Sequence, residues 1–141
     1  MGLFTRDEKI EALRQAPLFA GLSKKELGQI ARGTDEFDLQ PGHVLCREGG
    51  LAREFFVIVD GTIEVTQGGK PVALRGGGEF VGEIGLITHS KRTATVTAAT
   101  PVRCFVLTSG EFRRVLDDNP GIQQKVMQAL AERVADLESA Q

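Results

Sequence analysis

The segment 76–93 carries the residues whose types and spacing best suit ligand chemistry. Five of its eighteen residues are glycine, which allows close backbone approach, and Arg92 stands nine positions after Glu83. The run 83–87 favours one turn of helix, whose N–H groups attract an anion, and an arginine can bond two phosphate oxygens at once. A carboxylate repels phosphate, so Glu83 indicates a ligand that also carries hydroxyl groups. Phosphate with a neighbouring hydroxyl is typical of a nucleotide.

Each of these residues also has an ordinary structural explanation. Glu83 alone is an acid at a helix N-terminus, and Arg92 alone is a surface cation. We expect His89 and Lys91 to be solvated loop residues rather than ligands. Thr93 stays open, because a β-branched hydroxyl residue suits the start of a strand as well as a ligand contact.

Short β-strands are expected to position this segment. From Glu36 to about Leu107 the hydrophobic period is two, and glycine pairs mark the turns. Eleven of the 17 glycines lie between positions 42 and 85. Seven or eight short strands with turns about every 8–12 residues are typical of an antiparallel sandwich or jelly roll. Most of these glycines are therefore expected to serve turns, whereas those at 76–85 lead into or lie in the candidate site.

Helices are predicted on both sides of the strands. Capping boxes at 5–8, 23–26 and 108–111 each begin a helix, and Asn119 is predicted to cap a last helix that starts at Pro120. The apolar residues of this last helix recur every three or four positions: Ile122, Val126, Leu130, Val134 and Leu137. This stripe suits packing on the same domain and pairing with a second copy about equally.

The fold class expected is therefore mostly β with flanking helices (α+β), an antiparallel β-roll of about eight strands. We expect one domain, because 141 residues is an ordinary domain length. It would consist of an N-terminal helical segment at 1–33, a β-roll at 34–108 with the functional segment at 76–95, and C-terminal helices at 109–141.

Composition and charge argue against several functions. No apolar run approaches a membrane span, and the net charge of −2 gives no reason to expect DNA binding. Cys46 and Cys104 are expected to be reduced, buried thiols of a cytoplasmic protein, and two histidines cannot form a His-rich metal site. No nucleophile–base grouping or metal motif is present, so we expect no enzyme, no metal and no cofactor.

Several motifs resemble the cyclic-nucleotide-binding domain family, the cAMP and cGMP receptor modules of bacterial regulators, protein kinases and gated channels. Val81-Gly82-Glu83-Ile84-Gly85-Leu86-Ile87 is similar to the family's phosphate-binding cassette, and Arg92-Thr93-Ala94 follows at the family's spacing. The entry segment 17–23, the motif around 42–49 and the hairpin at 56–61 are similar as well. Val81 replaces the usual aromatic residue, and Lys91 replaces the common proline before the arginine.

The resemblance implies a role for each cassette residue. Arg92 would pair with the cyclic phosphate, Glu83 would accept from the ribose 2′-hydroxyl, and Thr93 would offer a hydroxyl to the phosphate or the purine. Backbone N–H groups at Gly82 and from Gly85 to Leu86 would complete the phosphate site. The implied ligand-binding set is Gly82, Glu83, Ile84, Gly85, Leu86, Arg92, Thr93 and Ala94. Val81, Arg133 and Leu137 would be base or lid contacts.

The function expected from this resemblance is a stand-alone sensor of cAMP or cGMP whose C-terminal helices change position when the ligand binds. Its partner would be an effector protein or a second copy of the chain joined through the last helix. The alternative is a degenerate family member that binds no ligand and serves as a dimerisation or protein-docking module. Intact Glu83 and Arg92 argue against that alternative.

Overall fold

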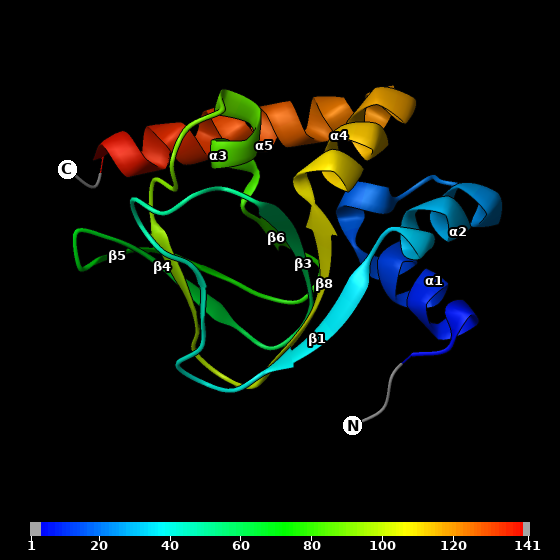
Figure 1. Ribbon diagram of the computed structural model, residues 1–141, viewed down its shortest axis with the longest axis horizontal. Helices are drawn as coiled ribbons and strands as arrows, with labels where there is room; N and C mark the ends of the chain where they lie inside the picture. The colour runs from blue at the N-terminus through cyan, green and yellow to red at the C-terminus, as the bar shows by residue number, and fades with distance from the viewer. Residues whose placement is uncertain (1–3, 140–141) are drawn as a thin grey trace.

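Two antiparallel sheets of four strands face one another in a β-roll, and helices pack against one side of it (Figure 1). The computed structural model describes the backbone of residues 4–139 and the side chains of residues 4–136. These eight strands with flanking helices confirm the predicted fold class. No helix among the described residues is long and apolar enough to cross a bilayer.

Consecutive strands belong to different sheets, except for β4 and β5, which form a hairpin in the second sheet. The first sheet has the order β1-β8-β3-β6 and the second the order β2-β7-β4-β5. Their bounds are β1 Asp35–Leu39, β2 Val44–Cys46, β3 Glu54–Asp60, β4 Ile63–Gln67, β5 Lys70–Arg75, β6 Phe80–Val81, β7 Thr95–Ala98 and β8 Val102–Thr108. The hairpin β4–β5 forms one edge of the second sheet, and β4 also pairs with β7, with Thr66 opposite Thr95. The tip of that hairpin therefore lies next to the chain that enters β7.

The described residues form six helical elements: α1 Arg6–Gln15, the 3₁₀ turn η1 Pro17–Phe19, α2 Lys24–Arg32, α3 Glu83–Thr88, α4 Ser109–Asp118 and α5 Pro120–Ser139. The capping boxes predicted for α1 and α2 are both present, because each cap residue and the glutamate three positions later exchange hydrogen bonds. These caps satisfy N–H groups that the first turn of a helix leaves free.

Two other predicted caps are only partly correct. At α4, Thr108 accepts from the Glu111 N–H, but the Glu111 carboxylate pairs with Arg114 instead of completing a box. At α5, Pro120 is the first residue as predicted, yet the Asn119 side chain donates to the Val115 carbonyl at the end of α4. In both cases a group of α4, the Arg114 side chain or the Val115 carbonyl, offers a competing partner.

Strand β6 was not expected from the sequence, because Phe80 and Val81 lie in the segment 76–93, for which only one turn of helix was predicted. These two residues pair with Val57 and Phe56 of β3. The three glycines before them turn the chain against β3: the Gly78 N–H donates to the Ile58 carbonyl at 2.7 Å, and a Cβ on Gly77 would lie 2.8 Å from the Val59 carbonyl oxygen. The run 76–78 thus serves a tight turn beside β3.

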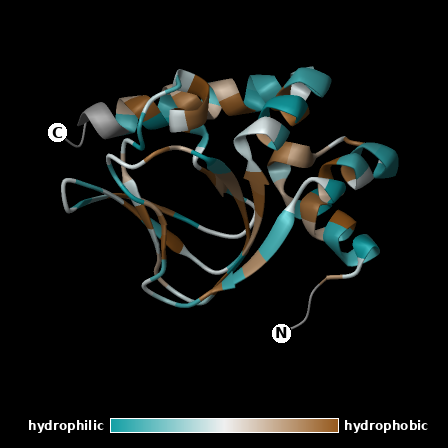
Figure 2. Ribbon diagram, in the orientation of Figure 1, coloured by the Kyte–Doolittle hydropathy of each residue, from teal (hydrophilic) through white to brown (hydrophobic). Residues whose placement is uncertain are grey.

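Two clusters of buried residues hold the fold together. One lies inside the roll and includes Ile58, Ile63 and Cys104; the other lies between the first sheet and the helices and includes Phe55, Phe105 and Phe112. Figure 2 shows hydrophobic residues concentrated on the strands that enclose the roll, while loops and the outer turns of α2 are mostly hydrophilic. Burial of this apolar surface is the main favourable term in folding.

Helix α5 packs against its own domain through the first half of the predicted stripe. Ile122 and Val126 are buried, whereas Leu130 and Val134 are only half-buried. Lys125 Nζ donates to the Pro17 carbonyl at 2.9 Å, which ties the helix to η1. The side chain of Leu137 lies outside the described residues.

Candidate functional site

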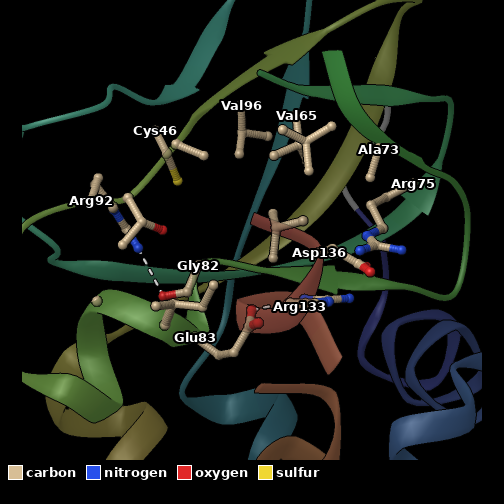
Figure 3. Close-up of a pocket in the computed structure, with 16 residues that line it drawn as sticks. Cys46, Val65, Ala73, Arg75, Gly82, Glu83, Arg92, Val96, Arg133 and Asp136 are labelled. Atoms are coloured by element: carbon tan, nitrogen blue, oxygen red, sulfur yellow. Dashed lines mark hydrogen bonds and ion pairs between the residues drawn. The ribbon is translucent and has the colours of Figure 1, made fainter. Parts of the chain in front are cut away.

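A pocket opens between the second sheet, the cassette around α3 and the C-terminal part of α5 (Figure 3). One wall is apolar and is formed by Cys46, Val65, Val72, Ala73, Val81 and Val96. The cassette contributes Gly82, Glu83, Ile84, Gly85, Arg92, Thr93 and Ala94. Charged side chains from two further elements, Arg75 of β5 and Arg133 and Asp136 of α5, complete the lining. The pocket therefore combines an apolar wall with a few charged groups, the usual composition of a small-molecule site.

Glu83 is the most unusual residue of this pocket, because only 1% of its surface is exposed. Its Oε1 accepts a hydrogen bond from Arg133 at 2.8 Å. Its Oε2 is buried and has no hydrogen-bond partner among the described residues. A buried acceptor without a donor is rare and costs free energy, so this oxygen is a candidate contact for a ligand hydroxyl.

Arg133 reaches Glu83 from α5. Its guanidinium carbon lies 4.5 Å from the centroid of the Phe80 ring, so the cation rests on an aromatic face while it pairs with the carboxylate. Only 14% of the Arg133 side chain is exposed. The sequence suggested a base or lid contact for Arg133; the structure shows a direct ion pair between the last helix and the cassette.

Arg92 lies on the other side of the cassette. Its Nη1 donates to the Gly82 carbonyl and its Nη2 to the Glu54 carbonyl, both at 2.7 Å. The side chain is 7% exposed, so it is a buried cation and not the surface cation of the simplest explanation. A guanidinium carries five N–H groups, so these two bonds orient it and leave others for an anion in the pocket.

Gly82 and Gly85 stand where the surrounding protein leaves no room for a Cβ atom. Gly82 has a φ of +100°, and a Cβ there would lie 2.9 Å from the Glu54 carbonyl oxygen. A Cβ on Gly85 would lie 2.6 Å from the Ala52 Cβ. Both glycines therefore make room for protein atoms that pack behind the cassette, and their backbone contacts to a phosphate stay a prediction.

The remaining residues of the predicted set divide between pocket and core. Ile84, Thr93 and Ala94 line the pocket, and so does the buried Val81. The Leu86 side chain instead joins the core beneath the cassette, which leaves only its backbone available for the predicted phosphate contact.

Most residues of the apolar wall, and two charged residues of the pocket, were not predicted from the sequence. Val65, Val72 and Ala73 belong to hairpin β4–β5, which was expected only as scaffold, and Arg75 and Asp136 were not singled out. Cys46 was expected only as a buried thiol, and burial raises its pKa to about 11. The one signal in the sequence was the position of Asp136, three residues after Arg133 on the same helix face.

Comparison with known proteins places this fold and pocket in a family. The family model for the cyclic nucleotide-binding domain matches residues 36–119. A cyclic nucleotide-gated potassium channel of Mesorhizobium japonicum is 34% identical over 139 residues, which cover 99% of this chain and 38% of that protein. The cGMP-dependent protein kinase, isozyme 1, of Drosophila melanogaster is 32% identical over 132 residues, which cover 88% of this chain and 17% of that protein. This chain thus spans less than half the length of these relatives.

Solved structures agree with the sequence matches. A regulatory subunit of a cAMP-independent protein kinase A from Trypanosoma brucei superposes with a TM-score of 0.81 at 25% identity, over 88% of this chain and 45% of that one. The cAMP-bound PfPKA-R superposes with a TM-score of 0.88 at 20% identity, over 96% of this chain and 47% of that one, and so shares the fold. With most of its length matched by the family model, this chain belongs to the cyclic nucleotide-binding domain family.

Proposed function

We propose that this chain is a regulatory domain that binds a cyclic purine nucleotide, cAMP or cGMP, in the pocket between the cassette and α5. The observation that carries the proposal is the buried, partnerless Oε2 of Glu83 in the pocket that Arg92 also lines. A ribose 2′-hydroxyl is a neutral donor that would satisfy this oxygen, and a cyclic phosphate is an anion that would pair with Arg92. A nucleotide carries both groups on one rigid unit.

The phosphate would lie against Arg92 and the first turn of α3. Gly82 supplies no side-chain cap to that turn, so its N–H groups remain for another acceptor. Thr93 and Ala94 line the same part of the pocket and would add a hydroxyl and an N–H group. Charge-assisted bonds of this kind are stronger than neutral ones, so Arg92 would contribute most to affinity.

The purine would stack on the apolar wall of Val65, Val72 and Ala73. Arg75 and Asp136 are drawn across the pocket from Arg92 in Figure 3, where the edge of the base would end. A carboxylate accepts from the amino group of adenine or guanine, and a guanidinium donates to N7 of either base or to O6 of guanine. Both nucleotides therefore fit this chemistry, and binding measurements must decide between them.

Binding would be coupled to α5 through the Arg133–Glu83 pair. The pair already holds α5 against the cassette at 2.8 Å. A hydroxyl donor at Oε2 would complete the hydrogen bonding of the buried carboxylate and so favour the state in which α5 is docked. Nucleotide binding would then increase the fraction of molecules in the docked state. The free energy of this shift cannot exceed the difference between the ligand's binding free energies for the docked and undocked states.

The output of this coupling would be an effector joined to or bound by the C-terminal helices. Relatives of this chain include gated potassium channels and protein kinase regulatory subunits, in which a domain of this family forms part of a longer protein. By analogy, we infer that the position of α5 is what an effector would sense.

Titration calorimetry with cAMP, cGMP and 5′-AMP tests the proposal, and it suits a chain that contains no tryptophan or tyrosine. We expect heat from at least one cyclic nucleotide and much weaker binding of 5′-AMP, whose phosphate is not held in the ring. Absence of binding of both cyclic nucleotides at about 0.1 mM would overturn the proposal in favour of the protein-docking alternative.

Two variants assign the contacts. Arg92→Lys keeps the positive charge but loses the guanidinium, whose paired N–H groups can bond two phosphate oxygens at once. It should therefore weaken cAMP and cGMP binding by about ten- to a hundredfold. Glu83→Gln should reduce the preference for cAMP over 2′-deoxy-cAMP, because a neutral amide oxygen is a weaker acceptor for the 2′-hydroxyl than a carboxylate. An unchanged preference in Glu83→Gln would show that the charge of Glu83 does not act on the ribose.

A further inference from the structure

The stretch from Arg92 to Ala94 runs between α3 and β7, outside any strand ladder. Bonds from neighbouring turns must therefore fix its position. The main chain of Arg92 makes two: its carbonyl accepts from the Gly49 N–H at 2.9 Å, and its N–H donates to the Gly50 carbonyl at 2.8 Å. These bonds hold Arg92 itself but leave the next peptide group, between Thr93 and Ala94, without an anchor.

The tip of hairpin β4–β5 supplies that anchor. We call Glu48, Gln67 and Gly68 the hairpin clamp. Gln67 Nε2 donates to the Thr93 carbonyl at 3.2 Å, and the Gly68 N–H donates to Glu48 Oε1 at 2.9 Å. The Glu48 N–H in turn donates to Thr95 Oγ1 at 3.0 Å. Each bond joins residues twenty or more positions apart, so the clamp is a tertiary feature and not a by-product of local turns.

We propose that the hairpin clamp sets the orientation of the Thr93–Ala94 peptide for phosphate binding, with Gln67 as the positioning residue. This inference rests on the proposed function, since it assigns a role in the same site. A trans peptide is planar, and its C=O and N–H groups point in opposite directions. When Gln67 holds the Thr93 carbonyl towards the hairpin, the Ala94 N–H must point away from the hairpin. Thr93 and Ala94 both line the pocket, so this N–H is then free for an oxygen of a ligand bound there.

Gln67 suits this task because its side chain is a neutral donor and is half-buried. A neutral amide holds the carbonyl without adding charge beside a phosphate. The carboxylate of the clamp belongs to Glu48, and it accepts a hydrogen bond from the Gly68 N–H at the exposed tip of the hairpin. A methionine at position 67 would keep nearly the same length and shape but could not donate, so the carbonyl would lose its anchor.

The first test needs no nucleotide. Amide chemical shifts of the ligand-free chain are compared between wild type, Gln67→Met and the control Gln124→Met, which changes an exposed glutamine of α5. We expect Gln67→Met to move the amides of residues 93–95 and Gln124→Met to leave them in place. Gln67→Lys, which restores a donor on a long side chain, should return them towards their wild-type positions. Unmoved amides at 93–95 in Gln67→Met would refute the positioning role.

The second test measures the effect on binding by calorimetry. Gln67→Met should weaken cAMP or cGMP by about three- to tenfold, with no change in the preference over the 2′-deoxy analogue. In an Arg92→Lys background, Gln67→Met should cause a smaller loss of binding affinity, because both residues act on the phosphate. Equal losses in the two backgrounds, or no loss, would overturn the inference. If the wild type binds neither cyclic nucleotide, the proposed function fails, whereas the chemical shifts still decide what Gln67 positions.

Discussion

Replacement of Arg133 by methionine tests the contact between α5 and the cassette. The substitution removes the guanidinium but keeps an unbranched apolar stem over the Phe80 ring. Glu83 is 1% exposed, so its carboxylate would stay largely buried after it has lost its ion-pair partner. Loss of one partner of a buried ion pair costs about 3–5 kcal/mol, and the residual exposure of Arg133 (14%) places the expected loss near the lower end, about 3 kcal/mol.

This loss is measured by urea or thermal unfolding followed by far-UV circular dichroism, where it corresponds to a fall in Tm of roughly 10 °C. The matched control is Arg113→Met, at an exposed arginine of α4, which should change the free energy of unfolding by no more than about 0.5 kcal/mol. The double variant Glu83→Gln with Arg133→Met removes both charges of the pair, so it should lose less stability than Arg133→Met alone. If Arg133→Met behaved like its control, the ion pair would not hold α5 in solution.

Three further substitutions probe the cassette and strand β1. Gly85→Ala should destabilise the chain by about 1–3 kcal/mol, because its Cβ would lie 2.6 Å from that of Ala52; adding Ala52→Gly should restore part of the thermal stability, and no recovery would contradict this packing. His89 ends α3 with a φ of 54°, so His89→Gly should raise the free energy of unfolding by roughly 0.5–1 kcal/mol, whereas a lower value in urea unfolding would show that its side chain is needed. The hydrogen bond from Arg103 lowers the pKa of Asp38, so the stability it contributes is present above the ordinary pKa of 3.8 and is lost as pH falls through the lowered value. Asp38→Asn should therefore flatten the acid side of the stability curve, and an identical curve would exclude this contribution.

Much of the fold was predictable because local signals and the global structure agree. Thr5 and Ser23 precede glutamates at the right spacing, and nothing nearby competes for them. The unbroken apolar run from Phe55 to Val59 likewise predicts a well-buried central strand, and Phe55 to Ile58 of β3 are all buried. At Glu111 and Asn119, by contrast, an arginine and a backbone carbonyl of the same helix compete successfully, and no cap rule contains that information.

The candidate site was predictable only where its residues are adjacent in sequence. Glu83 and Arg92 could be found from the cassette itself, but the partners that orient them are distant: Arg133 lies fifty positions after Glu83, and the Glu54 carbonyl lies thirty-eight before Arg92. The role of Gly85 depends on Ala52 in the same way. Such contacts arise from the topology of the two sheets and the path of α5, which hydrophobic periodicity does not specify.

The bond from Lys125 to the Pro17 carbonyl gives α5 a fixed point near its first third. From Lys125 to Ser139 the helix continues for fourteen residues, a rigid arm of about 21 Å. If the helix turned about Lys125, its far end would travel about 0.4 Å for each degree of rotation. The Arg133–Glu83 contact lies about 12 Å from the same point, so a displacement at the pocket is enlarged nearly twofold at Ser139. A turn of α5 about Lys125 would therefore produce its largest displacement at the end of the helix, beyond the Arg133–Glu83 contact.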